Sequence, residues 1–376
     1  MEIIMNFLQN TGHLFLYYIL PFVVVLGVMI FFHELGHFIV AKYFNVKVLK
    51  FALGFGPKII GKELGETEYS VRYIPLGGFV KMLGENEEED DESKDLSPSD
   101  EKRAFNKQHA MKRIAIVAAG PIFNLILALA LFCGSYLISG NYLMTTEIGQ
   151  ITDASPAYKA GLKNGDIITA VEGQGVKAWE DLKTIIQDQA GKPMAFTVQR
   201  GGETLNITVV PEETTVKNEF GEETKSAIIG IVAAGKYEKI AFTPLEAIGQ
   251  GFKDTWKWIK LTCLVVVKLF EGVVSIKTLG GPIMIGQLTG QLVQENIGYL
   301  IPFMAIISIN LGILNLFPIP ILDGGLIIFL LLELVMGRPL SIKKRELAQK
   351  IGFSILIALM ILVFYNDILR MFQSTQ

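Results

Sequence analysis

The chain has 376 residues, of which 51% are hydrophobic and only 19% are charged, with a formal net charge of −3 at pH 7. This composition is too apolar for an ordinary soluble protein and fits several membrane spans with one modest soluble domain. The negative balance, without basic clusters interleaved with aromatic residues, argues against a nucleic-acid partner.

Residues 1–45 predict a first membrane span that carries an H-E-x-x-H motif. Residues 14–32 contain no charge and run directly into His33, Glu34 and His37. Residues four apart share one face of a helix, so the two histidines can bind one metal ion, and imidazole pairs suit Zn²⁺. Glu34 can then take a proton from an activated water. A chance match with packed histidines is the alternative, disfavoured because polar groups in a membrane are costly.

Residues 46–84 predict a small membrane-associated β region on the cytoplasmic side. Strand-like segments at 46–51 and 69–74 are interrupted by glycine loops at 54–56 and 76–79. Lysines follow the first span and none precedes it, which argues against a signal peptide and places the N-terminus outside. A plain connector is the alternative.

Residues 85–110 are rich in acidic side chains and predict a solvated cytoplasmic loop. Basic residues then precede a second span at 111–140, which therefore exits outward. Within it, Gly120 and Pro121 predict a kink and Asn124 places an amide deep in the membrane. Both a bond to a neighbouring helix and a contact with the metal site are open for that amide.

Residues 145–235 predict an extracytoplasmic α/β domain. Its motifs are S-P-A at 155–157, A-G-L at 160–162 and G-D-I-I at 165–168, then a helix at 179–189 and strands at 195–200 and 204–210. This order resembles that of a bacterial PDZ domain, a module that binds peptide ends by adding a strand. The resemblance implies that a hydrophobic-Gly-hydrophobic loop, here Ile229 to Ile231 around Gly230, would hold a terminal carboxylate.

Residues 240–297 predict amphipathic helices at the outer surface of the membrane. Trp256 and Trp258 suit the headgroup level, and Lys268 and Glu271 leave the apolar run at 261–276 too short to span comfortably. A true span here would send the C-terminus inward, and the choice stays open.

The remaining sequence predicts a third span at 298–336, a cytoplasmic loop at 337–350 and a fourth span at 351–373, with both termini outside. Prolines within 302–320 predict that the third span is bent or broken, which a membrane tolerates where the chain lines a cavity.

A catalytic zinc takes three protein ligands and keeps one open position. His13 lies at the outer start of the first span and His109 in the cytoplasmic loop before the second, so we expect a carboxylate as the third ligand. Asp323 is the preferred carboxylate because prolines precede it and two glycines follow it. Irregular backbone at membrane depth is tolerated where it lines a cavity, so this segment is expected to face one. The candidates in apolar segments are Glu271, Asp323, Glu333 and Asp367.

H-E-L-G-H in the first span and N-L-F-P-I-P-I-L-D-G in the third together resemble the bacterial site-2 proteases of the RseP type, zinc enzymes that cut transmembrane helices within the bilayer. The resemblance covers nearly the whole chain. It implies zinc ligation by His33, His37 and Asp323, with Glu34 as base and an oxyanion or substrate contact from Asn315. It also implies that the β region clamps the unwound substrate. The predicted substrate-binding residues are Gly54, Phe55, Gly56, Asn124 and Gly230.

The fold class predicted is therefore a polytopic α-helical membrane protein with four transmembrane helices, a small β region and an inserted PDZ domain. The predicted function is zinc-dependent intramembrane cleavage in the bacterial inner membrane, with single-pass substrates such as trimmed anti-sigma factors or remnant signal peptides. The bilayer and a peptide C-terminus at the PDZ domain are the other predicted partners. The best-known relative carries two PDZ domains in tandem, whereas this chain has one.

Two other functions are compatible with parts of this pattern. A non-catalytic membrane adaptor would use the PDZ domain for binding and hold a structural zinc, which normally takes a fourth protein ligand such as Glu333. A metal transporter would show internal repeats and polar residues along several spans, which the sequence lacks.

Overall fold

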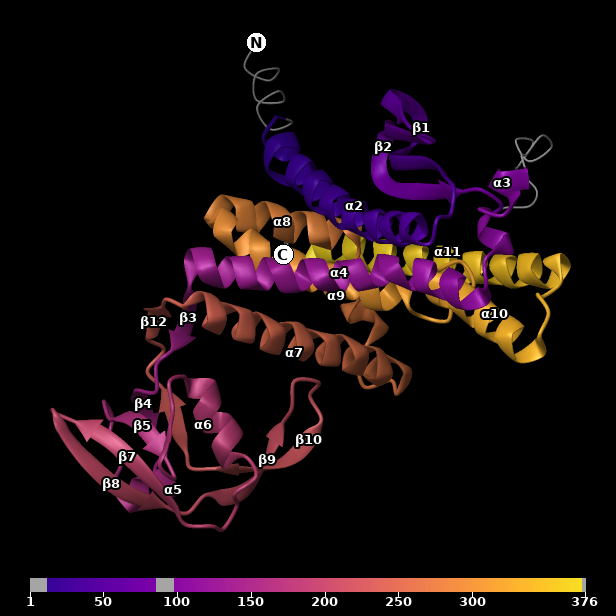
Figure 1. The fold of residues 1–376 in the computed structure, drawn as a ribbon. Helices are drawn as coiled ribbons and strands as arrows, with labels where there is room; N and C mark the ends of the chain where they lie inside the picture. Colours follow the sequence, from indigo (N-terminus) through magenta and orange to yellow (C-terminus); the bar gives the residue numbers. More distant parts are fainter. Residues whose placement is uncertain (1–11, 86–97, 374–376) are drawn as a thin grey trace. The chain divides into compact units, whose positions relative to one another are not determined.

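The computed structural model describes residues 12–85 and 98–373 and forms two compact units (Figure 1). Helices α4 and α7 each contribute to both, and each unit is described separately. Of the described residues, unit 1 comprises 12–85, 98–135, 248–267 and 275–373, and unit 2 comprises Tyr136–Ala247 and Lys268–Val274.

Unit 1 is mainly helical. Four of its helical segments are long and apolar enough to cross a membrane: Gly12–Tyr43, Ala110–Ser139, Ile297–Asn315 and Ile342–Gln373. Its principal helices are α2 (Leu20–Tyr43), α4 (Ala110–Ser139), α7 (Pro244–Phe270), α8 (Pro282–Glu295), α9 (Leu300–Asn315), α10 (Asp323–Met336) and α11 (Ile342–Gln373), with the short α3 (Pro98–Glu101).

The third apolar segment is broken. Helix α9 ends at Asn315 and α10 begins at Asp323, and residues 316–322 between them are irregular. Pro318 and Pro320 lie in this break, and a proline supplies no amide hydrogen to continue a helix. Asp323 therefore stands at the start of a new helix rather than in the middle of a long one.

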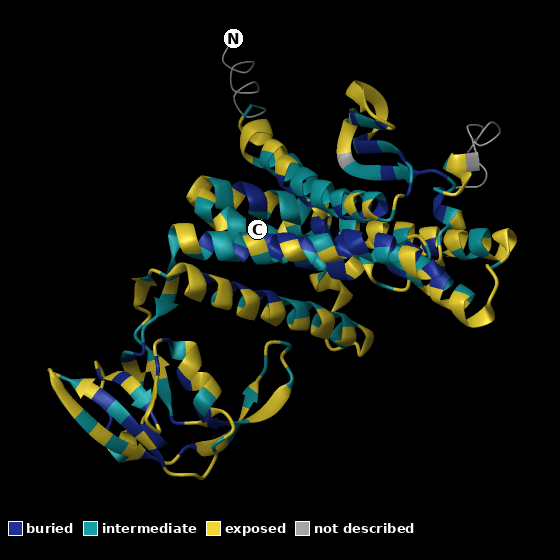
Figure 2. Cartoon of the chain, viewed as in Figure 1, coloured by how far each residue is buried: buried dark blue, intermediate teal, exposed yellow. Residues whose placement is uncertain are grey.

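Helix α4 is the central helix of unit 1. In an apolar stretch of 18 residues within α4, 44% of the residues are buried by protein, whereas in the corresponding stretch of α11 the share is 6% (Figure 2). The buried positions recur every three or four residues, as on one helix face. They include Arg113, Ile116, Val117, Gly120, Asn124, Leu127 and Ala128. The site described below is built against this face.

Strands β1 (Val48–Leu64) and β2 (Thr67–Met82) form the β region of unit 1. Residues 50–53 of β1 pair with residues 68–71 and also with residues 78–81, so this part of β1 is an interior strand. Its buried side chains, with those of the end of β2, pack on α2 and α4: Val48, Phe51, Val80 and Met82 join Ala41, Ile116 and Val117 in one core cluster. The sheet is thus fixed against the helix that carries H-E-x-x-H.

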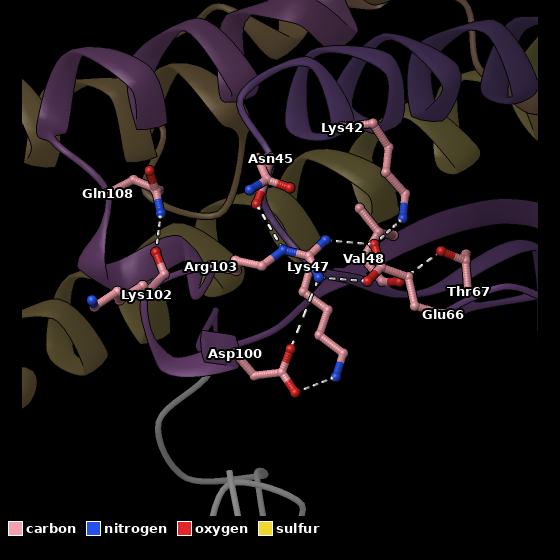
Figure 3. Close-up of polar contacts among 10 residues, drawn as sticks. All are labelled: Lys42, Asn45, Lys47, Val48, Glu66, Thr67, Asp100, Lys102, Arg103 and Gln108. Atoms are coloured by element: carbon pink, nitrogen blue, oxygen red, sulfur yellow. Dashed lines mark hydrogen bonds and ion pairs between the residues drawn. The ribbon is translucent and has the colours of Figure 1, made fainter. Parts of the chain in front are cut away.

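The turn between β1 and β2 is tied to the end of α2 by charged groups (Figure 3). The Arg103 guanidinium binds both carboxylate oxygens of Glu66 at 2.7 Å, and Lys42 Nζ lies 2.6 Å from Glu66 Oε1. Arg103 also donates to the Asn45 carbonyl. The hydrogen bonds from Arg103, helped by Lys42, lower the pKa of Glu66 to about 2.

Glu66→Gln is expected to destabilise unit 1 at neutral pH by about 1 kcal/mol, a modest effect because the pairs are partly exposed. Since the folded-state pKa lies below the ordinary value of 4.5, the stabilisation is complete above about pH 4.5 and is lost as the pH falls toward about 2. The difference in thermal unfolding temperature between wild type and variant, in detergent, should shrink from pH 7 to pH 3. A difference that stays constant over this range contradicts the assignment. Glu63→Gln, on the same hairpin, is the control.

Unit 2 is an α/β domain around a four-stranded sheet of order β6-β5-β7-β8. Strand β7 buries Met194, Phe196 and Val198 on one face, and these pack with Ile168, Val171 and Leu182 in the core. Its elements are β3 (Asn141–Met144), β4 (Ile148–Ile151), α5 (Pro156–Ala160), β5 (Ile167–Val171), β6 (Gln174–Gly175), α6 (Trp179–Ile186), β7 (Met194–Arg200), β8 (Glu203–Val209), β9 (Glu212–Lys217), β10 (Glu223–Ile228), β11 (Ile231–Ala233) and β12 (Tyr237–Ile240).

Two motifs singled out in the sequence have clear local roles in unit 2. The Ser155 side chain caps α5 by accepting the Tyr158 amide, Pro156 opens the helix, and Gly161 closes it with φ +85°. Asp166 is fully buried and accepts hydrogen bonds from Arg200 and the Lys163 amide.

The predicted fold class is confirmed: four helices suit a membrane, a small sheet follows the first, and an α/β domain with the predicted order of elements is inserted after the second. The acidic stretch lies mostly outside the described residues. Residues 244–270 form a single helix, α7, which is not among the four segments long and apolar enough to span.

Candidate metal centre

His33 and His37 lie on α2, one turn apart on the same face. Their rings meet edge to face with centroids 4.8 Å apart, and their Nε2 atoms are 3.3 Å apart. The side chains are largely buried, with exposures of 12% and 11%. Both Nε2 atoms therefore point at one small volume, as the four-residue spacing predicts.

Asp323 reaches the same volume from α10. Its Oδ2 lies 3.2 Å from His33 Nε2 and 3.6 Å from His37 Nε2. The two glycines that follow let the start of α10 pack on the broken segment, since a methyl group at Gly324 or Gly325 would lie 2.2 Å from the carbonyl oxygen of Leu316 or Ile319. Among the described residues, His33, His37 and Asp323 are the one group of three or more that could hold a metal ion.

The spacing of these three atoms fits zinc. Ligands held at 2.0–2.2 Å around a tetrahedral zinc lie about 3.3–3.6 Å from one another, close to the three separations found here. Asp323 Oδ2 is also buried with no hydrogen-bond partner, apart from its approach to the two ring nitrogens. Burying an unpaired carboxylate oxygen costs free energy, and a bound cation would supply the missing partner. Three ligands leave one position open, as catalytic zinc sites require.

Helix α4 holds the two rings from behind. His37 Nδ1 is 2.9 Å from the Ile116 carbonyl oxygen, and His33 Nδ1 is 3.1 Å from the Asn124 amide. Both contacts lie on the Nδ1 side of the rings, so they leave each Nε2 facing the site.

Two glycines allow α2 and α4 to approach this closely. A methyl group at Gly36 would lie 2.3 Å from the Ala119 carbonyl oxygen, and one at Gly120 would lie 2.3 Å from His37 Nε2 and 2.9 Å from His33 Cε1. The site therefore depends on two positions that carry no side chain.

Glu34 lies beside the metal centre against β2. A methyl group at Gly78 would come within 3.1 Å of Glu34 Cγ, and the backbone of Val80 interacts with the Glu34 carboxylate. Glu34 is half-buried and is not one of the three grouped ligands. The backbone of one strand thus runs next to the carboxylate predicted to move protons.

The other carboxylates that sequence left open as ligands have different partners. Glu271 pairs with Lys268, and Glu333 pairs with Arg113. Asp367 is buried and accepts the amides of Gly281, Ile283 and Met284 at the start of α8. No fourth protein ligand joins the group within the described chain.

The remaining predicted site residues lie outside the group of three side chains that could hold a metal ion. Asn315 is half-buried at the end of α9, just before the broken segment. Gly54 and Gly56 have φ values of +90° and +83°, and the Phe55 ring between them stacks on Phe79 with centroids 6.5 Å apart. Gly230 belongs to unit 2, between β10 and β11, with φ +76° and Ser155 packed against it.

Sequence reasoning missed two contributors. The Ile116 carbonyl could not be found because any residue supplies a backbone oxygen. The close approach at Gly36 could have been predicted, because a glycine between the two histidines allows another helix to pack there.

The chain matches peptidase family M50 over residues 21–359. Protein Atu1380 of Agrobacterium fabrum is 36% identical over 359 residues, which cover 93% of this chain and 95% of that protein. Zinc metalloprotease RasP of Geobacillus kaustophilus is 32% identical over 423 aligned positions, covering 94% of this chain and 98% of that protein. The PDZ domain of the SdrC-like protein Lmo2051 of Listeria monocytogenes is 19% identical, with a TM-score of 0.20, over 24% of this chain and 87% of that domain.

Proposed function

This chain belongs to peptidase family M50 and is a zinc metalloprotease, and from that premise we propose that it cuts single-pass membrane proteins inside the bilayer. The observation that carries the proposal is the depth of the metal centre. His33 lies within the apolar segment Gly12–Tyr43, about 13 Å along the helix from Lys42 at 1.5 Å per residue. A peptide bond that reaches this centre must itself lie below the headgroups.

The catalytic groups have separate tasks in this proposal. His33, His37 and Asp323 would hold the zinc, which would act as a Lewis acid and make water a nucleophile near neutral pH. Glu34 takes the proton of the attacking water and delivers it to the leaving amide nitrogen. Asn315 donates its amide hydrogen to the oxyanion that develops on the scissile carbonyl.

The substrate must give up its helix before it can be cut, because each peptide bond in a helix is engaged in hydrogen bonds and shielded by side chains. Strand β2 supports a way to hold the opened segment. Its residues 78–82 pair with β1 on one side only, and Gly78 lies against Glu34. An extended substrate segment added along β2 would exchange its helical hydrogen bonds for strand bonds beside the proton carrier. Gly54, Phe55 and Gly56, predicted to form a loop, lie within β1, and Phe55 contacts this strand by stacking on Phe79.

Cleavage of purified reporters in liposomes tests the proposal. Each reporter has one membrane span with a tag at either end, and the product masses identify the cut. We expect cuts within the span, abolished by chelation, and a rate that rises about fivefold for each Leu→Gly exchange near the cut, since glycine costs a helix roughly 1 kcal/mol. Cuts confined to exposed flanking segments would overturn the intramembrane site. A rate unaffected by glycine would overturn the requirement for helix opening.

Further parts of the proposal concern substrates and topology. We place the enzyme in the bacterial inner membrane with unit 2 and both termini outside, and trimmed anti-sigma factors or remnant signal peptides as substrates. Unit 2 then binds a newly formed C-terminus at the Gly230 loop. The alternative of a non-catalytic adaptor is overturned by membership in the peptidase family, and Glu333, its candidate fourth ligand, is paired with Arg113.

A further inference from the structure

The two histidines of the metal centre differ in what orients them. His37 Nδ1 faces the Ile116 carbonyl oxygen at 2.9 Å. A carbonyl only accepts hydrogen bonds, so Nδ1 of His37 carries the ring proton and Nε2 presents its lone pair to the metal. The orientation of this ring is therefore fixed by backbone alone.

His33 has a side chain in the equivalent place. Its Nδ1 is 3.1 Å from Nδ2 of Asn124, while Oδ1 of the same amide is buried with no hydrogen-bond partner. When Nε2 of His33 binds zinc, the neutral ring carries its proton on Nδ1 and needs an acceptor there. Nδ2 cannot accept, whereas Oδ1 can. Turning the amide by half a rotation exchanges these two atoms with almost no change in shape.

We propose that Asn124 is a positioning residue for zinc: its side-chain carbonyl accepts the Nδ1 proton of His33 and holds Nε2 of that ring toward Asp323 and His37. The amide oxygen of Asn124 then does for His33 what the carbonyl oxygen of Ile116 does for His37.

The surroundings of Asn124 suit this role. The residue is fully buried, its backbone carbonyl accepts the Ser308 hydroxyl at 2.7 Å, and a methyl group at Gly312 would lie 3.3 Å from its Cβ. Helix α9 thus contacts Asn124 at its backbone and Cβ, while the backbone of α4 carries the residue. Because the hydrogen bond between α4 and α9 uses the backbone of Asn124, its side chain is not needed for it and is free to serve His33.

Zinc affinity of the full-length protein in detergent, measured by competition with a chelator, tests the proposal. Asn124→Leu keeps the shape of the side chain but removes the acceptor, and we expect its zinc dissociation constant to rise about 10–100-fold, as when outer partners of zinc-binding histidines are lost. Asn124→Asp keeps an acceptor and loses both amide hydrogens, and we expect it to bind zinc nearly as wild type does. Ser308→Ala, which removes only the backbone contact, is the control and should leave the affinity unchanged.

A cobalt-substituted sample gives a second readout that a purely structural role would not alter. The visible ligand-field spectrum of the Asn124→Asp variant should match that of wild type, and that of Asn124→Leu should differ because the His33 ring is no longer held. Wild-type zinc affinity in Asn124→Leu would overturn the proposal. An Asn124→Asp variant that loses as much zinc affinity as Asn124→Leu would also overturn it. If the leucine variant does not fold, Asn124→Asp is compared with wild type, and a 10-fold or greater loss of zinc affinity overturns the proposal.

Discussion

Replacing Glu34 by glutamine is expected to lower the turnover number by about 10²–10⁴-fold, the usual contribution of a general base, while zinc content stays at the wild-type level. Glutamine has nearly the same shape and cannot take a proton. The three atoms grouped for the metal come from His33, His37 and Asp323, so the exchange leaves them in place. Zinc content by elemental analysis and cleavage of a single-span reporter are measured on the same preparation.

Asp323→Ala is the matched comparison for this experiment. It also removes a carboxylate from the site, but this carboxylate belongs to the group proposed to bind zinc, whereas that of Glu34 does not. It should lose zinc and cleavage together, whereas Glu34→Gln should lose cleavage alone. Undiminished cleavage by Glu34→Gln would remove Glu34 from the mechanism. Loss of zinc from Glu34→Gln would instead make it a ligand.

Adding one methyl group at Gly120 is expected to weaken zinc binding by about 100-fold or more, at or beyond the upper end of what outer-partner substitutions cost. The methyl carbon would lie 2.3 Å from His37 Nε2, 2.5 Å from its Cε1 and 2.9 Å from His33 Cε1, well inside contact distance. Either the two rings move or α4 withdraws from α2, and in both cases the ligand atoms separate. No ligand is replaced by this change.

Gly134→Ala provides the control on the same helix. A methyl group there meets nothing within 4 Å, and alanine favours a helix over glycine by about 1 kcal/mol. Zinc affinity and thermal unfolding are measured for both variants. Gly134→Ala should keep its zinc and unfold at the same or a higher temperature. Equal zinc affinity in the two variants would contradict the packing described around Gly120.

The grouping of His33, His37 and Asp323 could be predicted from helical periodicity and from the free-energy cost of placing polar groups in a membrane. The helical spacing of His33 and His37 places both on one face whatever the rest of the chain does. Asp323 could be chosen because prolines interrupt a helix and glycines allow close packing, so together they indicate a broken helix that packs against a partner. The structure has this break at residues 316–322.

Other parts could not be predicted, since they depend on contacts between distant segments. Residues 50–53 lie between two stretches of β2, and this position depends on the register of the strands. The alternation of side chains in a short sheet does not specify which strand lies inside. The Ile116 carbonyl leaves no trace in the identity of residue 116. Asn124 was visible as a buried amide, but its partner depends on how α4 crosses α2.

The proposed zinc ligands are far apart in the sequence, with two members on α2 and the third at the start of α10. A ribosome therefore has to synthesise almost the entire protein, and α10 has to fold back beside α2, before any molecule becomes able to hydrolyse a peptide bond. A nascent or truncated chain that lacks α10 would hold two of the three proposed ligands and lack the third. Late completion of the proposed ligand set would thus delay hydrolytic activity until most of the chain has been synthesised and folded.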